Sequence, residues 1–384
     1  MKRLLRAIEV PRDLLLGRYP DFVTGGTLRR GQVPVFVFHS IEPEPFARKL
    51  RHLADNGYVT LSVEEYFQVL TNARTAPERA VLLTLDDGRA SVYSVAYPLL
   101  KRHGMKAVVF LVPSRIGNEP ARPLGDDWRA LTAPPANEGF LSWEEVRLLA
   151  ASGLFEFQSH SLSHARIHTG PSVAGFMTPE LQTGYAALDA PRIHQAGRDL
   201  DPQEVALGTP LLRSEPRLSE ALRFYEDPKV REACVQRVAS QGGPGFFLRE
   251  DWRQQLRRLL DGRPIPGRYE TPEEREAAIR RELSDARRLI EEQTGRPVLH
   301  VCYPWHVAGP TTLRVARETG HRAAFCGKVA GVPISLPGGD PFRIARIGED
   351  WLLSLPGKDR VPLTEILREK WSRRLGRPRR PGRP

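Results

Sequence analysis

Short apolar runs rich in β-branched residues alternate with helical patterns along this chain, and the alternation limits the fold more than any other feature. Buried strands are predicted at residues 33–41, 80–88, 106–114 and 155–161. Helices are predicted between these runs, as at 45–58, where apolar residues recur at helical spacing. This order is typical of a parallel sheet or an α/β barrel.

The rhythm breaks over residues 166–269, which are rich in Gly, Pro and Arg, and it resumes with a helix that begins at Thr271. Ser-x-x-Glu and Thr-x-x-Glu patterns predict capping boxes at Ser142 and at Thr271. We therefore expect a main domain formed by residues 31–165 and 270–364. The segment 166–269 is predicted to be an insertion over one mouth of the sheet.

The two ends of the chain are basic. The chain has 384 residues and a formal net charge of +11, and Lys and Arg are concentrated in a Pro- and Gly-rich tail. We expect residues 365–384 to be a mobile basic tail and residues 1–30 to be a basic, amphipathic segment. A solvated terminus, contact with an anionic membrane surface and contact with nucleic acid are all open; nucleic acid is least favoured, because no recognition motif accompanies the tail.

Three cysteines, with no CxxC pair among them, do not form a disulfide framework, which indicates a reducing compartment. The apolar runs near the N-terminus are interrupted by charged residues and by Pro11. They match neither a signal peptide nor a transmembrane helix. The expected location is cytoplasmic, with peripheral contact at the inner face of the membrane as an option.

Polar side chains stand where the predicted strands end. Asp86 and Asp87 close one strand, while His39 and His160 close two others. Parallel α/β folds place their chemistry at the carboxyl ends of strands. Two adjacent carboxylates at a turning strand end could divide the work, one binding a cation and the other moving protons. A plain Asp-Asp-Gly turn is the alternative interpretation.

His160 and His164 are four residues apart. Histidines at this spacing share one face of a helical turn and could bind one metal ion. With Asp87 they supply three ligands and leave positions for water and substrate, as in catalytic metal sites. A chance pair of surface histidines is the alternative, and the joint occurrence with the carboxylates weighs against it.

The order of three motifs, "TLDDG", "HSLSH" and "YPW", resembles the polysaccharide deacetylases, the NodB-homology or carbohydrate esterase family 4 group. The segment "LSWEEVRLLAASG" is similar to the helix that precedes the family's histidines. The resemblance covers about residues 33–164 and 271–353. It implies a distorted (β/α) barrel of about seven strands, with the long insertion between the histidine motif and the Tyr-Pro motif.

The resemblance also implies roles. Asp87, His160 and His164 would hold a divalent metal, with zinc as the first candidate. Asp86 would be the base that takes a proton from the attacking water, and a backbone N–H near Tyr303 would stabilise the oxyanion. Contacts with substrate or oxyanion are assigned to Tyr303, Pro304, Trp305, Asp350 and Trp351.

The chain departs from the family pattern at three points. Leu85 stands where the first motif usually carries Phe, which is a mild change. Cys302 stands where the third motif usually carries the Arg that pairs with the base, and Arg343 or Arg346 could replace that charge. The histidine of the fifth motif has no counterpart. His39 and His306 are the candidates for the general acid, with a structural role as the alternative for each.

The expected activity is metal-dependent hydrolysis of an N-acetyl amide on an amino sugar of a bacterial glycan or glycan precursor. The expected cytoplasmic location favours a precursor, lipid-linked or otherwise. One alternative is a deformylase that acts on a lipid-linked formamido sugar, and the other is a catalytically inactive carbohydrate-binding domain. The long insertion is expected to control substrate choice, and its aromatic residues could stack on sugars or be buried.

Overall fold

The largest element of the fold is a curled parallel sheet. The computed structural model describes residues 12–14, 16–124, 139–260, 262, 265–329 and 331–374. Seven strands run in the order β13-β12-β5-β4-β3-β1-β14, and an eighth, β2, pairs with the start of β3. The strands are β1 (Val35–Phe38), β2 (Val59–Thr60), β3 (Ala80–Asp87), β4 (Ala107–Leu111), β5 (Phe155–Ser159), β12 (His300–Cys302), β13 (Ala323–Phe325) and β14 (Ile347–Gly348).

The two ends of this sheet approach each other through one short segment. Ile347 pairs in register with Phe36 of β1, while Ile344, three residues earlier, bridges to Phe325 of β13. The sheet therefore curls into a distorted, incompletely closed (β/α) barrel, which confirms the predicted fold class.

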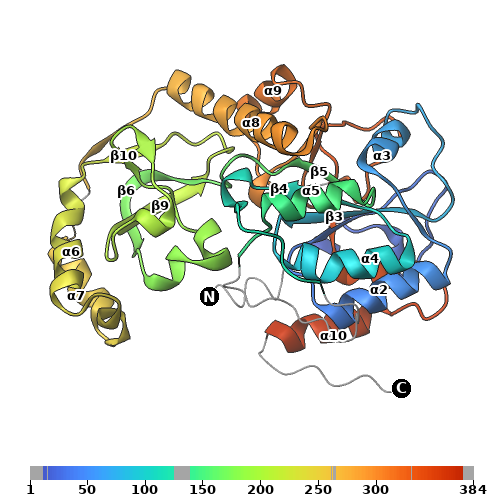
Figure 1. Cartoon of the computed structure of the whole chain (residues 1–384), viewed down its shortest axis with the longest axis horizontal. Helices are drawn as coiled ribbons and strands as arrows, with labels where there is room; N and C mark the ends of the chain where they lie inside the picture. Colours follow the sequence, from blue (N-terminus) through green and yellow to red (C-terminus); the bar gives the residue numbers. More distant parts are fainter. Residues whose placement is uncertain are drawn as a thin grey trace.

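Helices cover the outside of the sheet (Figure 1). They are α2 (Pro43–Asp55), α3 (Val63–Leu70), α4 (Tyr97–His103), α5 (Trp143–Ala151), α8 (Pro272–Thr294), α9 (Pro310–Glu318) and α10 (Leu363–Arg374). Shorter helical turns are η1 (Asp21–Thr24), η2 (Val92–Ala96), η3 (Pro113–Arg115), η9 (Pro304–His306) and η10 (Glu349–Ser354). The capping boxes predicted at Ser142 and Thr271 both form, so these two helices begin where the local sequence specifies.

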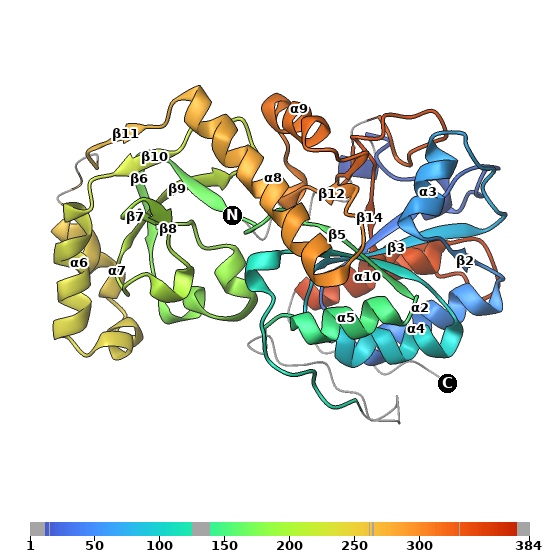
Figure 2. The ribbon, with the colours of Figure 1, turned by 45° about the horizontal axis from the view of Figure 1, so that its top comes forward.

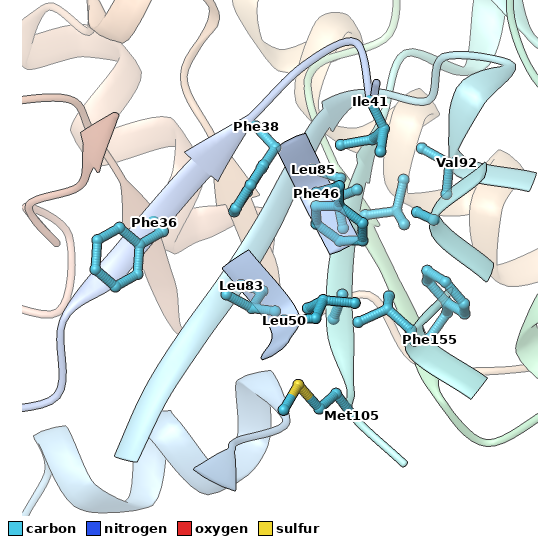
Figure 3. Packing of buried hydrophobic residues seen from close by; sticks show 14 of the residues in the cluster. Phe36, Phe38, Ile41, Phe46, Leu50, Leu83, Leu85, Val92, Met105 and Phe155 are labelled. Atoms are coloured by element: carbon cyan, nitrogen blue, oxygen red, sulfur yellow. The ribbon is translucent and has the colours of Figure 1, made fainter. Parts of the chain in front are cut away.

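Apart from the short strand β2, the strands are largely buried on both faces, as in other parallel sheets. Leu83 and Leu85 of β3 face the outer helices, and Figure 3 shows Leu85 beside Phe46 of α2. Leu82 belongs to a second cluster, inside the barrel. Because side chains alternate along a strand, Asp86 lies on the same inward face as Leu82, which places its carboxylate in the barrel.

Residues 166–269 form a lobe beside the barrel, and α8 runs from this lobe to the sheet (Figure 2). Its strands are β6 (Arg166–Phe176), β7 (His194–Gln195), β8 (Arg198–Asp199), β9 (Pro210–Pro216), β10 (Phe224–Glu226) and β11 (Gly267–Tyr269), paired as β6-β9, β7-β8 and β10-β11. Its helices are η5 (Pro179–Gln182), η6 (Gly184–Leu188), η7 (Pro202–Glu204), α6 (Lys229–Ser240), η8 (Gly243–Leu248) and α7 (Trp252–Leu259).

The lobe has apolar clusters of its own. Some of the aromatic residues that could have stacked on sugars belong to these clusters. Phe224 and Phe246 are 5% and 0% exposed, so packing explains these two rings and sugar stacking does not. The boundaries predicted between the main domain and the insertion stay a prediction.

The C-terminal prediction needs a correction. Residues 365–374 belong to α10, not to a mobile tail. Ile366 is buried, and Leu363 and Leu367 pack against the main core, so a short apolar stripe holds the helix despite its basic charge. Residues 1–11 and 15 of the predicted N-terminal segment and residues 375–384 of the tail lie outside the described residues, whereas Tyr19, Phe22 and Val23 of the same N-terminal segment are buried in the main core. Among the residues described, no helix combines the length and apolar character needed to cross a membrane.

Candidate active site

Four of the predicted site residues meet at the carboxyl ends of β3 and β5. The Nε2 atom of His160 lies 3.6 Å from Oδ1 of Asp87 and 3.9 Å from Oδ2 of Asp86. The Nε2 atom of His164 lies 3.8 Å from the same Asp87 oxygen. One ligand atom from each of Asp87, His160 and His164 lies within 4.8 Å of the others, and all three side chains are buried.

Backbone turns, and not a helix, bring the two histidines together. The sequence predicts that His160 and His164 share a helical turn, but the chain after β5 is a loop in which Ser161 and His164 have φ angles of 61° and 51°. The Ser161 hydroxyl accepts a hydrogen bond from the His164 N–H at 3.1 Å. The predicted proximity of His160 and His164 is confirmed, and the predicted helical turn is wrong.

The site concentrates unusual backbone geometry. Nine described residues other than glycine have positive φ angles, and five of them lie here. The five are Asp87, Ser161, His164, Trp305 and His306. Each left-handed non-glycine residue costs on the order of 1–3 kcal/mol and persists only where its surroundings impose it, which is typical of functional sites. The turn at Asp87 also explains how two adjacent carboxylates face one pocket.

Hydrogen bonding fixes the tautomer of His160. Its Nδ1 lies 2.8 Å from the Cys302 carbonyl oxygen, so Nδ1 carries the proton and Nε2 presents a lone pair to the carboxylates. Burial lowers the pKa of His160, and burial together with the neighbouring His160 lowers the pKa of His164 to about 3. Both rings are therefore neutral near pH 7, which is the form that binds a metal.

Asp86 is held by Arg346, which reaches it from the segment before β14. The guanidinium donates from Nη1 to Oδ1 at 2.7 Å and from Nη2 to Oδ2 at 2.8 Å. Burial would raise the pKa of Asp86, but Arg346 and His160 hold it well below its usual range. Arg346 thus supplies the positive charge that the family's Arg usually provides from the position of Cys302. The other candidate, Arg343, is exposed to solvent.

A second group of possible ligands, formed by Asp86, His160 and Cys302, is close enough to hold an ion. Its chemistry does not fit, because Arg346 already occupies both Asp86 oxygens and places Nη2 at 2.8 Å from the Cys302 sulfur. Burial also raises the pKa of the Cys302 thiol well above its ordinary value, so no thiolate is offered. The donor set that fits a metal is Asp87, His160 and His164.

Sequence reasoning missed Arg89, two residues beyond Asp87. Its Nε and Nη2 atoms donate to Oδ2 of Asp87 at 2.9 and 2.7 Å, which leaves Oδ1 turned toward the histidines. Burial would raise the pKa of Asp87, and the charges of His39 and Arg89 lower it below its usual value. The sequence could have indicated this contact only through the position of Arg89, a basic residue two positions after Asp87.

Both candidates for the general acid lie at this site. His39 follows β1 as an exposed residue, and its charge contributes to the lowered pKa of both Asp86 and Asp87. The ring of His306 packs on Gly327, where a Cβ atom would come within 2.6 Å of the imidazole. The structure brings both histidines near the carboxylates, and the choice between them stays a prediction.

The Tyr-Pro motif contributes one clear wall of the site. The Trp305 ring is half-exposed and lies 4.1 Å from the His164 ring, and the Arg166 guanidinium lies 5.1 Å from Trp305. The backbone N–H of Tyr303 donates to the Phe325 carbonyl at 3.1 Å, and Pro304 has no N–H. An oxyanion donor near Tyr303 would therefore have to come from Trp305 or beyond.

Asp350 and Trp351, which were assigned to substrate, make structural contacts. Asp350 forms an ion pair with Lys370 of α10. Trp351 is 1% exposed and packs on Tyr19, with ring centroids 4.9 Å apart. These contacts hold η10 against the terminal elements of the chain, and the burial of Trp351 corrects its assignment to a substrate surface.

Comparison with known proteins agrees with the resemblance to polysaccharide deacetylases that the sequence motifs indicated. Residues 73–190 match the family model "Polysaccharide deacetylase". The Bacillus subtilis protein YxkH, which is named for the same family, is 29% identical over 150 residues, covering 37% of this chain and 47% of its own. The poly-beta-1,6-N-acetyl-D-glucosamine N-deacetylase of Escherichia coli O157:H7 is 29% identical over 219 residues, covering 56% of this chain and 31% of that protein.

Among solved structures, a de-N-acetylase from Aggregatibacter actinomycetemcomitans superposes with a TM-score of 0.50 at 19% identity, covering 82% of this chain and 94% of that chain. This likeness concerns the fold alone. The chain spans less than half the length of the two curated relatives named above. The matching segment contains Asp86, Asp87, His160 and His164, and the chain therefore carries a domain of the polysaccharide deacetylase family.

Proposed function

We propose that this protein is a metal-dependent N-deacetylase that hydrolyses acetamido groups on a polymer of N-acetylglucosamine. The observation that carries the proposal is the meeting of Asp87, His160 and His164 within 4.8 Å, beside a carboxylate, Asp86, that is fixed by Arg346. The name of the Escherichia coli relative supports the substrate class.

Asp87, His160 and His164 would hold the metal ion. Two neutral imidazoles and one carboxylate favour zinc, because they match its usual donors and leave positions open. When bound, a divalent ion of this kind polarises an amide carbonyl and makes water more acidic.

Asp86 would accept the proton of the attacking water. The bidentate contact with Arg346 keeps Asp86 ionised at neutral pH and fixes its orientation. The same contact makes Asp86 a poor site for keeping the proton, since its pKa lies far below 7. A second group would protonate the departing amine, and His39 and His306 are the candidates for this role.

Trp305 would position the sugar. A half-exposed indole beside His164 offers an apolar face on which a pyranose ring can stack. The deacetylase name of the Escherichia coli relative points to a polymer, whereas the sequence favoured a glycan precursor, lipid-linked or otherwise. The convergence of Asp86, Asp87, His160 and His164 on one point disfavours an inactive sugar-binding domain. A deformylase would use the same residues, and only the deacetylase names of the relatives favour an acetamido substrate over a formamido one.

The test uses the full chain. Bound metal is measured by plasma emission, and acetate and free amine are measured after incubation with poly-β-1,6-N-acetylglucosamine and with a formamido sugar. We expect close to one divalent ion per chain and acetate release that a chelator abolishes and zinc restores. Asp86→Asn serves as the matched inactive control. Bound metal without acetate release from any acetylated glycan would contradict the proposal.

Location is a separate proposal. We propose a cytoplasmic protein whose two basic ends touch anionic lipid; the outermost parts of these ends, residues 1–11 and 375–384, lie outside the described residues. Liposome flotation of the full chain and of a doubly truncated chain tests this, and equal recovery of the two with anionic vesicles would refute it.

A further inference from the structure

Arg89 holds one oxygen of the metal-ligand candidate Asp87. Its Nε and Nη2 atoms donate to Oδ2 at 2.9 and 2.7 Å, while its Nη1 donates to the Ser40 hydroxyl at 2.8 Å. The Arg89 side chain is 17% exposed, so the contact is largely shielded from water. The result is a carboxylate with one oxygen tied back and the other, Oδ1, free to face the histidines.

The guanidinium of Arg89 is itself held from the other side, by the insertion. The Tyr185 ring of η6 stacks on it, with 4.0 Å between the guanidinium carbon and the ring centroid. Tyr185 is braced in turn by Phe140, whose ring centroid lies 5.6 Å away at an angle of 80°. A residue of the lobe thus reaches a group that contacts the ligand set of the barrel.

We propose that Arg89 is the positioning residue of Asp87, and that Tyr185 holds Arg89 in place, so that the insertion sets the metal affinity of the barrel. The proposal rests on the proposed function, because it assumes that Asp87 binds a metal ion. It assigns the insertion a role at the metal centre in addition to any contact with substrate.

Two physical effects oppose each other here. The charge of Arg89 repels a divalent ion, so its removal would strengthen metal binding if electrostatics dominated. Its two donors also prevent the carboxylate from rotating, so its removal would weaken binding if orientation dominated. Groups that hydrogen-bond a metal ligand from outside typically contribute about 10- to 100-fold to affinity, which favours orientation.

The first measurement is zinc affinity, by competition with a chromophoric chelator, on metal-free full-length protein. Arg89→Ala is expected to bind zinc about 10- to 100-fold more weakly than the parent. Arg89→Lys keeps the charge but loses the planar pair of donors, so its zinc affinity should lie between that of the parent and that of Arg89→Ala. Arg253→Ala is the matched control, because Arg253 stacks on Trp252 at 4.2 Å in α7 and should leave zinc affinity unchanged.

The second measurement tests the link to the insertion. Tyr185→Ala should weaken zinc binding, and Tyr185→Phe, which keeps the ring, should not. If Tyr185 acts through Arg89, the double variant Arg89→Ala/Tyr185→Ala should bind zinc as Arg89→Ala does, and strict additivity would overturn this link. Thermal unfolding of each metal-free variant shows whether the fold is kept. If Arg89→Ala does not fold, the zinc affinities of Tyr185→Ala and Arg89→Lys still test whether Arg89 and Tyr185 position Asp87.

The outcomes separate the two proposals. A parent that binds no divalent metal would overturn the proposed function and this inference with it. A parent that binds zinc while Arg89→Ala binds it equally well or more tightly would overturn the inference alone.

Discussion

The ion pair between Arg346 and Asp86 allows a quantitative prediction. The two side chains are 0% and 1% exposed, and two hydrogen bonds of 2.7 and 2.8 Å join them. Arg346→Met keeps much of the volume and removes the charge and every donor. The Asp86 carboxylate would then remain buried without its counter-ion, and the hydroxyl of Thr84, 3.0 Å from Nη1, would lose a donor.

Removing one partner of a buried pair costs about 3–5 kcal/mol of unfolding free energy, because the other charge stays desolvated. We therefore expect a loss of about 4 kcal/mol at pH 7. The pKa of Asp86 is lowered in the folded parent, so the stabilisation is present above the unfolded pKa and is lost as the pH falls through the folded pKa. The difference between parent and variant should shrink toward acidic pH, where the buried carboxyl of the variant becomes protonated.

Urea unfolding of both proteins in the metal-free state, at pH 7 and near pH 5, measures this difference. The double variant Asp86→Asn/Arg346→Met removes both charges and should recover much of the lost stability. A loss below about 1 kcal/mol at pH 7, the scale of an exposed pair, would refute the view that Arg346 neutralises a buried carboxylate. A double variant no more stable than Arg346→Met would refute it as well.

Three further predictions concern the site. Asp87→Ala should lose most of its bound metal, whereas Asp86→Asn should keep close to one ion per chain and lose most of its turnover. Plasma emission measures the bound metal, amine labelling measures the turnover, and equal metal loss in the two variants would contradict the division of roles. His39→Ala or His306→Ala should lower turnover by roughly 10²- to 10⁴-fold, and near-normal rates in both would place the general acid elsewhere. Trp305→Ala should raise KM for the polymer more than it lowers kcat, which steady-state kinetics would show, and an unchanged KM would remove Trp305 as a sugar platform.

Local patterns were sufficient to predict the fold class and to predict that Asp87, His160 and His164 lie close together. The strand at 80–88 and the capping boxes at Ser142 and Thr271 depend on neighbours a few residues away, so the sequence alone specifies them. Parallel strands bring their carboxyl ends to one edge, and for that reason the sequence predicts that Asp87 and His160 lie close together.

Only the tertiary structure decided which partners these residues have. Arg346 lies 260 positions from Asp86, and its neighbour Arg343 was an equal candidate until the register of β14 with β1 placed one inside the barrel and the other in solvent. The contact between Arg89 and Tyr185 likewise depends on how the insertion packs against the barrel. Long-range contacts of this kind follow from strand register and packing, and such information is absent from any local stretch of the chain.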